Sequence, residues 1–425
     1  MQPPLYLRDF FTEHLPRKAT IITGVRRCGK TMFEQLYMQQ LITSGVPKAY
    51  ICPLDFSDDR LFALRTEEPG VVAEAYYELF PDAHEQKVYF FFDEIQYLNR
   101  WELFVNRLQT TENCEVNITG SSAKMLTKEI ATEFGGRSLN WELFPFSYYE
   151  FVLAQQQIAA QPFSVAQMTT MQRELCKHWF ELYCERGGFP ESVGISDDRT
   201  RVVLFQNIAE TAAFRDVIKR HNLPNPNEVS RLQQLLFGNM AKLISFSKLQ
   251  QRMSGEQFKI SKEMVKLLVS YFEDAYIFFT VEILSANAAV RSTNPKKLYC
   301  ADHALALACT AAVTENKGFL LENIAFLHLR RAHAADEIHY YKTANGKEID
   351  FVVGELPNVQ LVQVSYDISE PETEKRELSA LEKAMTELHL SESLLITHDT
   401  EKDCAVNGGT VHVLPMWKWL LVGKK

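Results

Sequence analysis

Several features that mark other protein classes are missing from this 425-residue chain. No apolar stretch approaches the ~20 residues that a bilayer-crossing helix needs, so no membrane partner is expected. The first residues lack the charged segment followed by an apolar one that marks a secretory signal. The 8 cysteines form no C-x-x-C pair and have no His-x₃-His partner, so we expect reduced thiols and no zinc site. These absences predict a cytoplasmic protein.

Basic charge is also scarce. The chain has 45 lysines and arginines against 54 acidic residues, a net charge of −9. Its bulk electrostatics therefore do not favour a polyanion partner, although a local basic face stays open. With 46% hydrophobic and 23% charged residues, the composition is typical of soluble globular proteins. The length predicts about two to four domains.

One pattern near the start of the chain carries the strongest functional signal. Residues 24–31 fill every position of G-x-x-x-x-G-K-[ST], between a β-prone run at 19–23 and a helical segment at 32–42. Such a loop turns successive N–H groups toward phosphate oxygens at the positive end of a helix. Lys30 then reaches the β- and γ-phosphates, and the Thr31 hydroxyl can ligate Mg²⁺. The predicted nucleotide-binding residues are Gly24, Val25, Arg26, Arg27, Cys28, Gly29, Lys30, Thr31 and Met32.

The first ~150 residues alternate between strand-like and helix-like segments, which predicts a parallel α/β sheet. Further strands are expected at 50–56, 88–92, 115–119 and 138–143. Pro53 interrupts the first of these and favours an edge position. The continuous apolar run at 88–92 is typical of a strand that is buried on both faces.

After residue 151 the pattern becomes mainly helical, with a boundary loop at 222–227 and several short helices at 228–284. Strands return in what reads as a separate α/β unit. They are expected at 297–299, 337–342, 348–353, 361–366 and 394–397.

Two acidic residues follow the apolar strand 88–92. A carboxylate at the carboxyl end of such a strand lies beside the phosphate loop, where open parallel sheets bind ligands. We expect Asp93 to hold the Mg²⁺ shell and Glu94 to orient or deprotonate the attacking water.

Polar residues near the next strand are further candidates. Ser121 is expected to reach between the γ-phosphate and the water, with Thr119 and Ser122 as substitutes; the alternative is that these serines cap the following helix. Arg137 follows two glycines and invites an arginine-finger role, which offsets charge on the transferred phosphoryl group. A structural ion pair is an equally good interpretation of Arg137.

The ordered set of motifs resembles a family of bacterial and archaeal P-loop ATPases. Its members have an AAA-type core, then a winged helix and a restriction-endonuclease-like C-terminal domain. The resemblance rests on residues 24–31, 92–96, 118–123, 144–151, 187–191, 317–323 and 346–351. It implies an AAA-like P-loop core over 1–153, a helical lid or linker over 154–225, a winged-helix-like domain over 226–290 and a PD-(D/E)XK nuclease-like domain over 291–425. It also implies ATP rather than another nucleotide.

The implied winged helix spans about 228–284, and this fold often contacts DNA in other proteins. Its basic side chains could form a phosphate-contacting face. They could equally be the solvated side of ordinary helices, which is the interpretation we favour. The residues concerned are Lys242, Lys248, Arg252, Lys259, Lys262 and Lys266.

The implied nuclease-like domain lacks most of its expected metal site, which is an Asp followed by a Glu-x-Lys pair on the next strand. Asp350 stands in the first position, but Gln363 replaces the carboxylate and Ser365 replaces the lysine. Glu322 on the preceding helix is a further candidate ligand. Because an amide binds Mg²⁺ less well than a carboxylate, we expect a defunct nuclease whose fold is kept for recognition or docking.

Three functions are therefore weighed. The leading one is an ATPase that requires ATP and Mg²⁺, whose cycle rearranges the C-terminal domains. The second is a nucleotide-gated scaffold or DNA-binding switch with little turnover, which acts with a protein partner or by self-association. The third, least favoured, is an active DNA nuclease.

Overall fold

The structure is a computed structural model that describes residues 15–65, 68–126, 134–155, 168–256, 258–310 and 317–422. The chain forms two compact units. The first unit comprises Met1–Pro145 together with Asp274–Tyr276, and the second comprises Phe146–Glu273 with Ile277–Lys425. The four domains expected from the sequence stay a prediction beyond this division.

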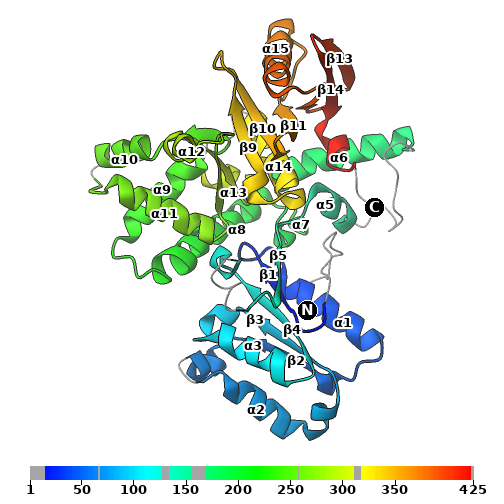
Figure 1. Ribbon diagram of the computed structural model, residues 1–425, viewed down its shortest axis with the longest axis vertical. Coiled ribbons are helices and arrows are strands. Elements are labelled where there is room, and N and C mark those ends of the chain that lie inside the picture. Colours follow the sequence, from blue (N-terminus) through cyan, green and yellow to red (C-terminus); the bar gives the residue numbers. More distant parts are fainter. Residues whose placement is uncertain are drawn as a thin grey trace. The chain divides into compact units, whose positions relative to one another are not determined.

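The first unit is built on a five-stranded sheet with the order β2-β3-β4-β1-β5, in which every neighbouring pair is parallel (Figure 1). Its helices and strands are β1 (Ala19–Thr23), α1 (Lys30–Thr43), β2 (Ile51–Asp55), α2 (Gly70–Leu79), β3 (Val88–Asp93), α3 (Trp101–Thr111), β4 (Cys114–Gly120) and β5 (Ser138–Glu142). The predicted parallel α/β fold is confirmed, and β2, which carries Pro53, is an edge strand.

β3 is buried on both of its faces, as its apolar run predicts. On one face, Phe92 packs against Phe104 of α3, with ring centroids 5.8 Å apart. On the other face, Phe91 meets Tyr37 of α1 at 5.7 Å. Because alternate residues of a strand point to opposite sides, α1 and α3 cover opposite faces of the sheet. This packing fixes the carboxyl end of β3 beside the start of α1.

The second unit contains more helices and two sheets. Its helices are α5 (Tyr148–Ala154), α6 (Thr170–Arg186), α7 (Pro190–Val193), α8 (Asp198–Thr211), α9 (Pro226–Phe237), α10 (Phe246–Gly255), α11 (Lys262–Asp274), α12 (Ala288–Thr293), α13 (His303–Cys309), α14 (Lys317–Ala332), α15 (Pro371–Leu388) and α16 (Met416–Trp419). Its strands are β6 (Lys242–Ile244), β7 (Phe278–Val281), β8 (Lys296–Cys300), β9 (Ile338–Lys342), β10 (Glu348–Glu355), β11 (Asn358–Val364), β12 (Glu392–Thr397), β13 (Lys402–Val406) and β14 (Gly409–Pro415).

The larger sheet of this unit has six strands in the order β13-β14-β12-β11-β10-β9. It is mixed, because β9, β10 and β11 are antiparallel neighbours whereas β11, β12 and β14 run parallel. Helix α15 packs on it through Leu381, Ala384 and Met385, which are buried with the strand residues Leu361 and Leu395. The strands expected near the end of the chain therefore form a sheet with a helix packed on it, but they belong to the same compact unit as the preceding helices.

The smaller sheet is antiparallel, with the order β6-β8-β7. The predicted strand at 297–299 is confirmed as part of β8, but it belongs to this smaller sheet and not to the larger one. Leu298 of β8 pairs with Lys242 of β6 on one side and with Thr280 of β7 on the other. A short apolar run shows that a strand exists but not which strands lie beside it.

Candidate functional site

The loop between β1 and α1 is shaped by two glycines. A Cβ at Gly24 would lie 2.0 Å from the carbonyl oxygen of Leu143, so no other residue fits there. Gly29 forms the N-cap of α1 with a φ of 102°, in the left-handed region that glycine tolerates best. The loop therefore passes directly into a helix whose first N–H groups have no partner within the helix, a favourable place for an anion.

Lys30, the first residue of α1, lies over this loop. Its side chain is buried, and its Nζ donates to the carbonyl oxygens of Gly24 at 2.9 Å and Val25 at 3.1 Å. The ammonium is thus held where loop-bound phosphate oxygens would lie. Of the other predicted loop residues, Val25 and Cys28 are buried, Arg26 and Met32 are half-buried, and Arg27 is exposed.

The end of β3 brings Asp93 to the start of α1. The Thr31 hydroxyl donates to Oδ2 of Asp93 at 2.5 Å, and the Thr119 hydroxyl donates to Oδ1. Hydroxyl and carboxylate oxygens are hard donors, which Mg²⁺ prefers. Thr31 and Asp93, predicted separately as magnesium ligands, therefore lie together and fit this ion.

Glu94 is held at the next position by several contacts. Its φ of 52° lies in the left-handed region, which is uncommon for a residue other than glycine. Ser121 donates to Oε2 of Glu94 at 3.1 Å, and the Gln96 amide donates to the same oxygen. The backbone N–H of Glu94 donates to the Thr119 hydroxyl at 3.2 Å. Unusual backbone geometry held by surrounding contacts is typical of functional residues.

The residues named near the end of β4 divide between the two carboxylates. Ser121 contacts Glu94, whereas Thr119, named as a substitute, contacts both Asp93 and the backbone of Glu94. Ser122, the residue after Ser121, is also buried. Gln96 also contacts Glu94, and sequence reasoning gave this side chain no role.

The surroundings of Asp93 and Glu94 shift the pKa values of the two carboxylates in opposite directions. Burial raises the pKa of Asp93 above its usual range, even though two threonine hydroxyls favour the charged form. Burial also opposes ionisation of Glu94, but the charges of Lys30 and Arg26 lower the pKa of Glu94 below its usual range. Neighbouring groups whose pKa values are pushed apart are typical of acid–base sites. Glu94 is therefore ionised at neutral pH and can orient water or accept a proton.

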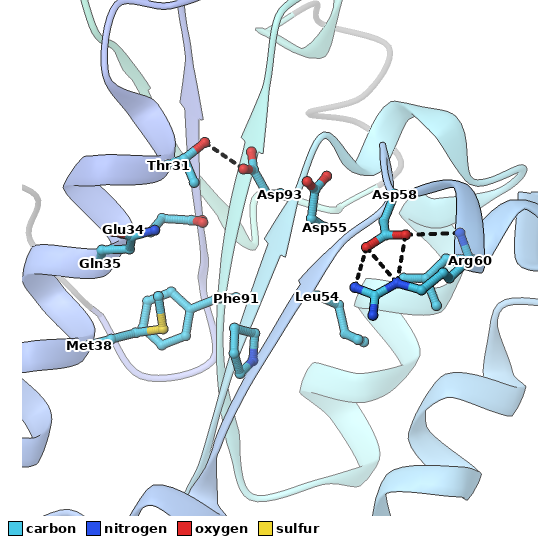
Figure 2. A pocket seen from close by; sticks show the side chains of 12 residues that line it. Thr31, Glu34, Gln35, Met38, Leu54, Asp55, Asp58, Arg60, Phe91 and Asp93 are labelled. Carbon is cyan, nitrogen blue, oxygen red and sulfur yellow. Dashed lines mark hydrogen bonds and ion pairs between the residues drawn. The ribbon is translucent and has the colours of Figure 1, made fainter. Parts of the chain in front are cut away.

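A cavity of about 550 Å³ lies beside Thr31 and Asp93 (Figure 2). Besides Asp58, which is paired with Arg60, two further acidic residues line it. Asp55 ends β2 and pairs in register with Asp93, and Glu34 comes from α1. Burial, and after it the charges of Asp93 and Asp55, raise the pKa of Glu34 well above its usual range. Sequence reasoning missed both residues.

Arg137 lies at the amino ends of β1 and β5, whereas the nucleotide loop follows the carboxyl end of β1, which argues against an arginine-finger role at its own site. Its carbonyl oxygen accepts from the N–H of Ala19, at the start of β1, at 2.8 Å. Its guanidinium donates to Asn106 and Thr110 of α3 at 3.0 and 2.9 Å. The loop follows the other end of β1, about 17 Å away at ~3.3 Å per strand residue. An arginine side chain is shorter than this distance.

A second group of carboxylates surrounds Lys297 in the second unit. Its Nζ lies 2.8 Å from Glu322 Oε1, 3.0 Å from Glu348 Oε1 and 2.7 Å from Asp350 Oδ1. Lys297 is only 1% exposed, so a full ammonium is enclosed here. Burial opposes its charge, but Asp350 and Glu322 outweigh burial and raise the pKa of Lys297 well above its usual range. We call Lys297, Glu322, Glu348 and Asp350 the Lys297 cluster.

The predicted nuclease-like residues meet only in part. Glu322 and Asp350 come together at Lys297, as described above. Gln363 instead accepts from the backbone N–H of Asp350 at 3.0 Å, and its amide donates to Glu377 at 2.9 Å. The amide of Gln363 therefore serves the packing between β10, β11 and α15 and does not face the cluster's cation.

Ser365 also has a local partner, because its hydroxyl donates to the carbonyl oxygen of Asp367 at 3.3 Å. Within the described ranges, no three His, Cys, Asp or Glu side chains are arranged to hold a metal ion directly. Sequence reasoning gave no role to Lys297 or Glu348. In the Lys297 cluster, the lysine supplies the positive charge that a metal ion would bring.

The six basic side chains named for the winged-helix region lie mainly at the surface. Five are exposed, and the sixth, Lys242, lies over the ring of Phe319 with Nζ 4.6 Å from its centroid. Arg252 lies 3.9 Å from Glu256, which also pairs with Arg231. Acidic neighbours of this kind are typical of a solvated helix surface.

The sequence was compared with protein-family models and with known proteins. Residues 16–152 match the family described as AAA domain, and residues 177–316 and 317–419 match two domains of unknown function, DUF8612 and DUF4143. The uncharacterized protein MJ1544 of Methanocaldococcus jannaschii is 32% identical over 422 residues, which cover 97% of this chain and 90% of that protein. The chain belongs to the family of this archaeal protein.

Another family relative is an uncharacterized protein of Haemophilus influenzae, 25% identical over 405 residues, which cover 94% of each chain. Among solved structures, the Aeropyrum pernix ORC1 protein in complex with DNA has 13% identity and a TM-score of 0.32, covering 73% of this chain and 88% of that one. The AAA match supports an AAA-type ATPase domain in the first unit, as the resemblance implied. None of the described helices has the length and apolar character needed to cross a membrane.

Proposed function

We propose that the first unit binds ATP with Mg²⁺ and hydrolyses it, and that this cycle rearranges the domains of the second unit. The observation that carries the proposal is the 2.5 Å hydrogen bond between Thr31 and Asp93. It joins the phosphate loop to the acidic end of β3, so one bound nucleotide can contact both. The AAA match supports the same function.

In this proposal the loop N–H groups and Lys30 hold the phosphates. The ammonium of Lys30 exchanges the loop carbonyl oxygens for phosphate oxygens. Thr31 and Asp93 hold Mg²⁺, which when bound offsets the charge of the phosphates. Glu94 accepts a hydrogen bond from the attacking water and orients it, and Ser121 keeps the Glu94 carboxylate in place.

ATP binding by the wild type and by Lys30→Ala tests the nucleotide site. A fluorescent ATP analogue is titrated into each protein, with Mg²⁺ and with EDTA. We expect tight binding by the wild type with Mg²⁺ and no measurable binding by Lys30→Ala. Lys48→Ala is the matched control, because Lys48 is an exposed lysine of the same unit. Equal affinities for the wild type and Lys30→Ala would contradict the proposal.

A second candidate function is a nucleotide-gated switch with little turnover of its own. It is favoured by the position of Arg137, which cannot offset charge on the nucleotide of its own chain. Another copy or a partner then supplies the arginine. Measuring ATP turnover per molecule over a range of protein concentrations separates the two functions. A constant rate supports a self-sufficient site, and a rate that rises with concentration supports an arginine from a second copy.

For the second unit, we propose a winged-helix-like part followed by a nuclease-like part that does not cleave DNA. Three helices, α9, α10 and α11, with the antiparallel sheet β6-β8-β7, support the first assignment. The ammonium of Lys297 among the carboxylates supports the second. Supercoiled plasmid with Mg²⁺ or Mn²⁺ should stay intact. Cleavage that Asp350→Ala abolishes would contradict this assignment.

A further inference from the structure

Two carboxylates beside the proposed magnesium site have no part in the function proposed above. Glu34 follows Thr31 by three residues on α1, and Asp55 ends β2. Asp55 pairs in register with Asp93 across neighbouring strands, so the two aspartates lie side by side on one face of the sheet. Figure 2 shows the Glu34 side chain pointing from α1 toward that face. Three carboxylates from three elements thus surround one end of the cavity.

None of these three carboxylates, Glu34, Asp55 and Asp93, forms an ion pair within the described part of the chain. The charge of Lys30 favours ionisation of Glu34, but burial and the charges of Asp93 and Asp55 outweigh it and raise the pKa of Glu34. Lys30, the nearest lysine in sequence to Glu34, donates to loop carbonyl oxygens instead. Like charges so close together raise each other's energy, and a cation from outside relieves this.

Glu34 is the most informative of the three. It is 3% exposed, and its Oε1 atom has no hydrogen-bond partner among the described residues. Leaving such an oxygen unpaired costs about 1–3 kcal/mol, so a buried polar atom of this kind normally has a partner such as a ligand or an ordered water. The cavity of about 550 Å³ that Glu34 lines also reaches Thr31 and Asp93. The partner of Glu34 is therefore expected inside this cavity.

We propose that Glu34 and Asp55 hold the water ligands of the magnesium ion that Thr31 and Asp93 bind. The inference rests on the proposed binding of ATP and Mg²⁺ and adds two positioning residues to it. Magnesium usually keeps several waters in nucleotide sites, and these waters need acceptors. Carboxylates are strong acceptors for such water.

Contact through water also agrees with the spacing of the side chains. In the part of the chain that the structure describes, no three acidic side chains converge closely enough to ligate one ion directly. The opposite end of the cavity is apolar and is lined by Met38, Leu54 and Phe91. Of the other polar lining residues, Asp58 is already paired with Arg60, so among the described residues Glu34 and Asp55 are the acidic acceptors without an ion pair beside Thr31 and Asp93.

The test measures how much Mg²⁺ each protein needs in order to bind ATP. A fluorescent ATP analogue is held at fixed concentration while Mg²⁺ is raised, for the wild type, Glu34→Gln and Asp55→Asn. Losing a group that holds a metal's ligands typically weakens metal binding by about 10- to 100-fold. We expect half-saturation to need at least about 10-fold more Mg²⁺ in both variants, and saturating Mg²⁺ to restore wild-type nucleotide affinity.

Asp58→Asn is the matched control. Asp58 lines the same cavity, but it is paired with Arg60 at 2.6 Å, so its charge is already offset. Its Mg²⁺ requirement should equal that of the wild type. Thermal unfolding checks that each variant is folded, and the test uses two variants on different elements so that one misfolded protein does not end it.

The outcomes separate this inference from the proposed function. A wild-type Mg²⁺ requirement in folded Glu34→Gln and Asp55→Asn would overturn the inference while leaving ATP binding in place. An equal shift in all three variants would also overturn it, because it would reflect general surface charge. A wild-type chain that binds no ATP analogue at any Mg²⁺ concentration would instead overturn the proposed function itself.

Discussion

The two units both gather acidic side chains, but they neutralise them in different ways. In the second unit, Lys297 sends its ammonium to within 3.0 Å of three carboxylates. In the first unit, Lys30 donates to loop carbonyl oxygens, and Asp93 and Glu34 have no ion-pair partner among the described residues. The carboxylates around Lys297 are neutralised by a cation of the chain itself. The carboxylates around Asp93 have no ion-paired cation of this kind within the described ranges and are suited to bind a metal ion.

The two buried lysines, Lys297 and Lys30, therefore have different roles. A buried lysine among carboxylates gains little net stability from the pair, but removing it strands the opposite charges. A lysine folded over a phosphate loop can be removed at a smaller cost, because carbonyl oxygens tolerate water or weaker partners. The predictions below use this contrast.

The largest effect is expected for Lys297→Met. This change leaves the buried carboxylates of Glu322 and Asp350, and the half-buried one of Glu348, without their partner, which costs about 3–5 kcal/mol. Lys30→Met should cost less, about 1–3 kcal/mol, because it removes a donor from two loop carbonyl oxygens and a positive charge near Glu94. Urea unfolding, followed through the midpoint of the second unit for Lys297→Met and of the first unit for Lys30→Met, checks both values.

Lys296→Met is the control for this comparison. Lys296 is adjacent in sequence and pairs with Glu282 at 2.8 Å, but its side chain is 21% exposed. Its loss should cost about 1 kcal/mol or less. If Lys297→Met and Lys296→Met unfold at the same urea concentration, Lys297 does not hold its cluster together.

In Lys297→Met, the remaining carboxylates of the Lys297 cluster should bind a divalent metal ion, as we propose for the carboxylates of the first unit. As they stand, Glu322, Glu348 and Asp350 are not arranged to ligate a metal ion directly, but all three contact the ammonium, so after its removal their freed oxygens can turn toward an external cation. Mn²⁺ at about 100 times its dissociation constant would stabilise Lys297→Met by about 2.7 kcal/mol. The wild type, which already contains the cation of the cluster, should not respond. A similar rise in the unfolding midpoints of both proteins would show that the metal binds elsewhere.

The acidic partner of Lys297 gives a pH dependence. Burial, and after it the charge of Asp350, raises the pKa of Glu322 from 4.5 to about 7. Between these values the folded chain keeps a proton that the unfolded chain has released. This contribution to stability is therefore fully present below about pH 4.5 and is lost as the pH rises through about 7.

Glu322→Gln removes the titrating group, so the difference between the two proteins isolates this effect. From about pH 4.5 to 7.5, the stability of the wild type should fall by roughly 1–3 kcal/mol relative to Glu322→Gln. Unfolding midpoints at several pH values measure this difference. Parallel curves for the two proteins would mean that Glu322 titrates normally.

The smallest effect is expected for Arg137→Ala. Arg137 contacts α3 at the amino ends of the strands, away from the nucleotide loop. Its removal should therefore leave ATP turnover unchanged. An arginine finger would instead be worth about 10³-fold or more. A large loss of turnover at low protein concentration, where copies do not meet, would contradict the position assigned to Arg137.

Much of the first unit could be predicted because its signals are local. Glycines, a lysine and a strand ending in acidic residues stand close together in the sequence, and the rule for parallel strand ends brings Asp93 to Thr31. The same rule could have found Asp55, which also ends a parallel strand. Glu34 was missed because a glutamate within a helix usually faces water, and only the packing of α1 on the sheet buries it.

The second unit was harder to predict because its contacts are distant in sequence. Lys297 meets Glu322 and Asp350 from 25 and 53 positions away. Nothing next to Lys297 distinguishes it from a surface lysine, and the sequence does not show which strands lie beside its own. Gln363 and Ser365 could be read from the sequence, but the ammonium of Lys297 beside Glu322 and Asp350 could not.

The decisive experiment is steady-state ATP turnover by the purified chain and by Glu94→Gln, with nucleotide binding measured on the same samples. We expect Mg²⁺-dependent phosphate release by the wild type. Glu94→Gln should bind ATP as the wild type does but release phosphate at least about 100-fold more slowly, because it cannot accept the proton of the attacking water. Equal turnover by the two proteins would contradict the role given to the acidic end of β3.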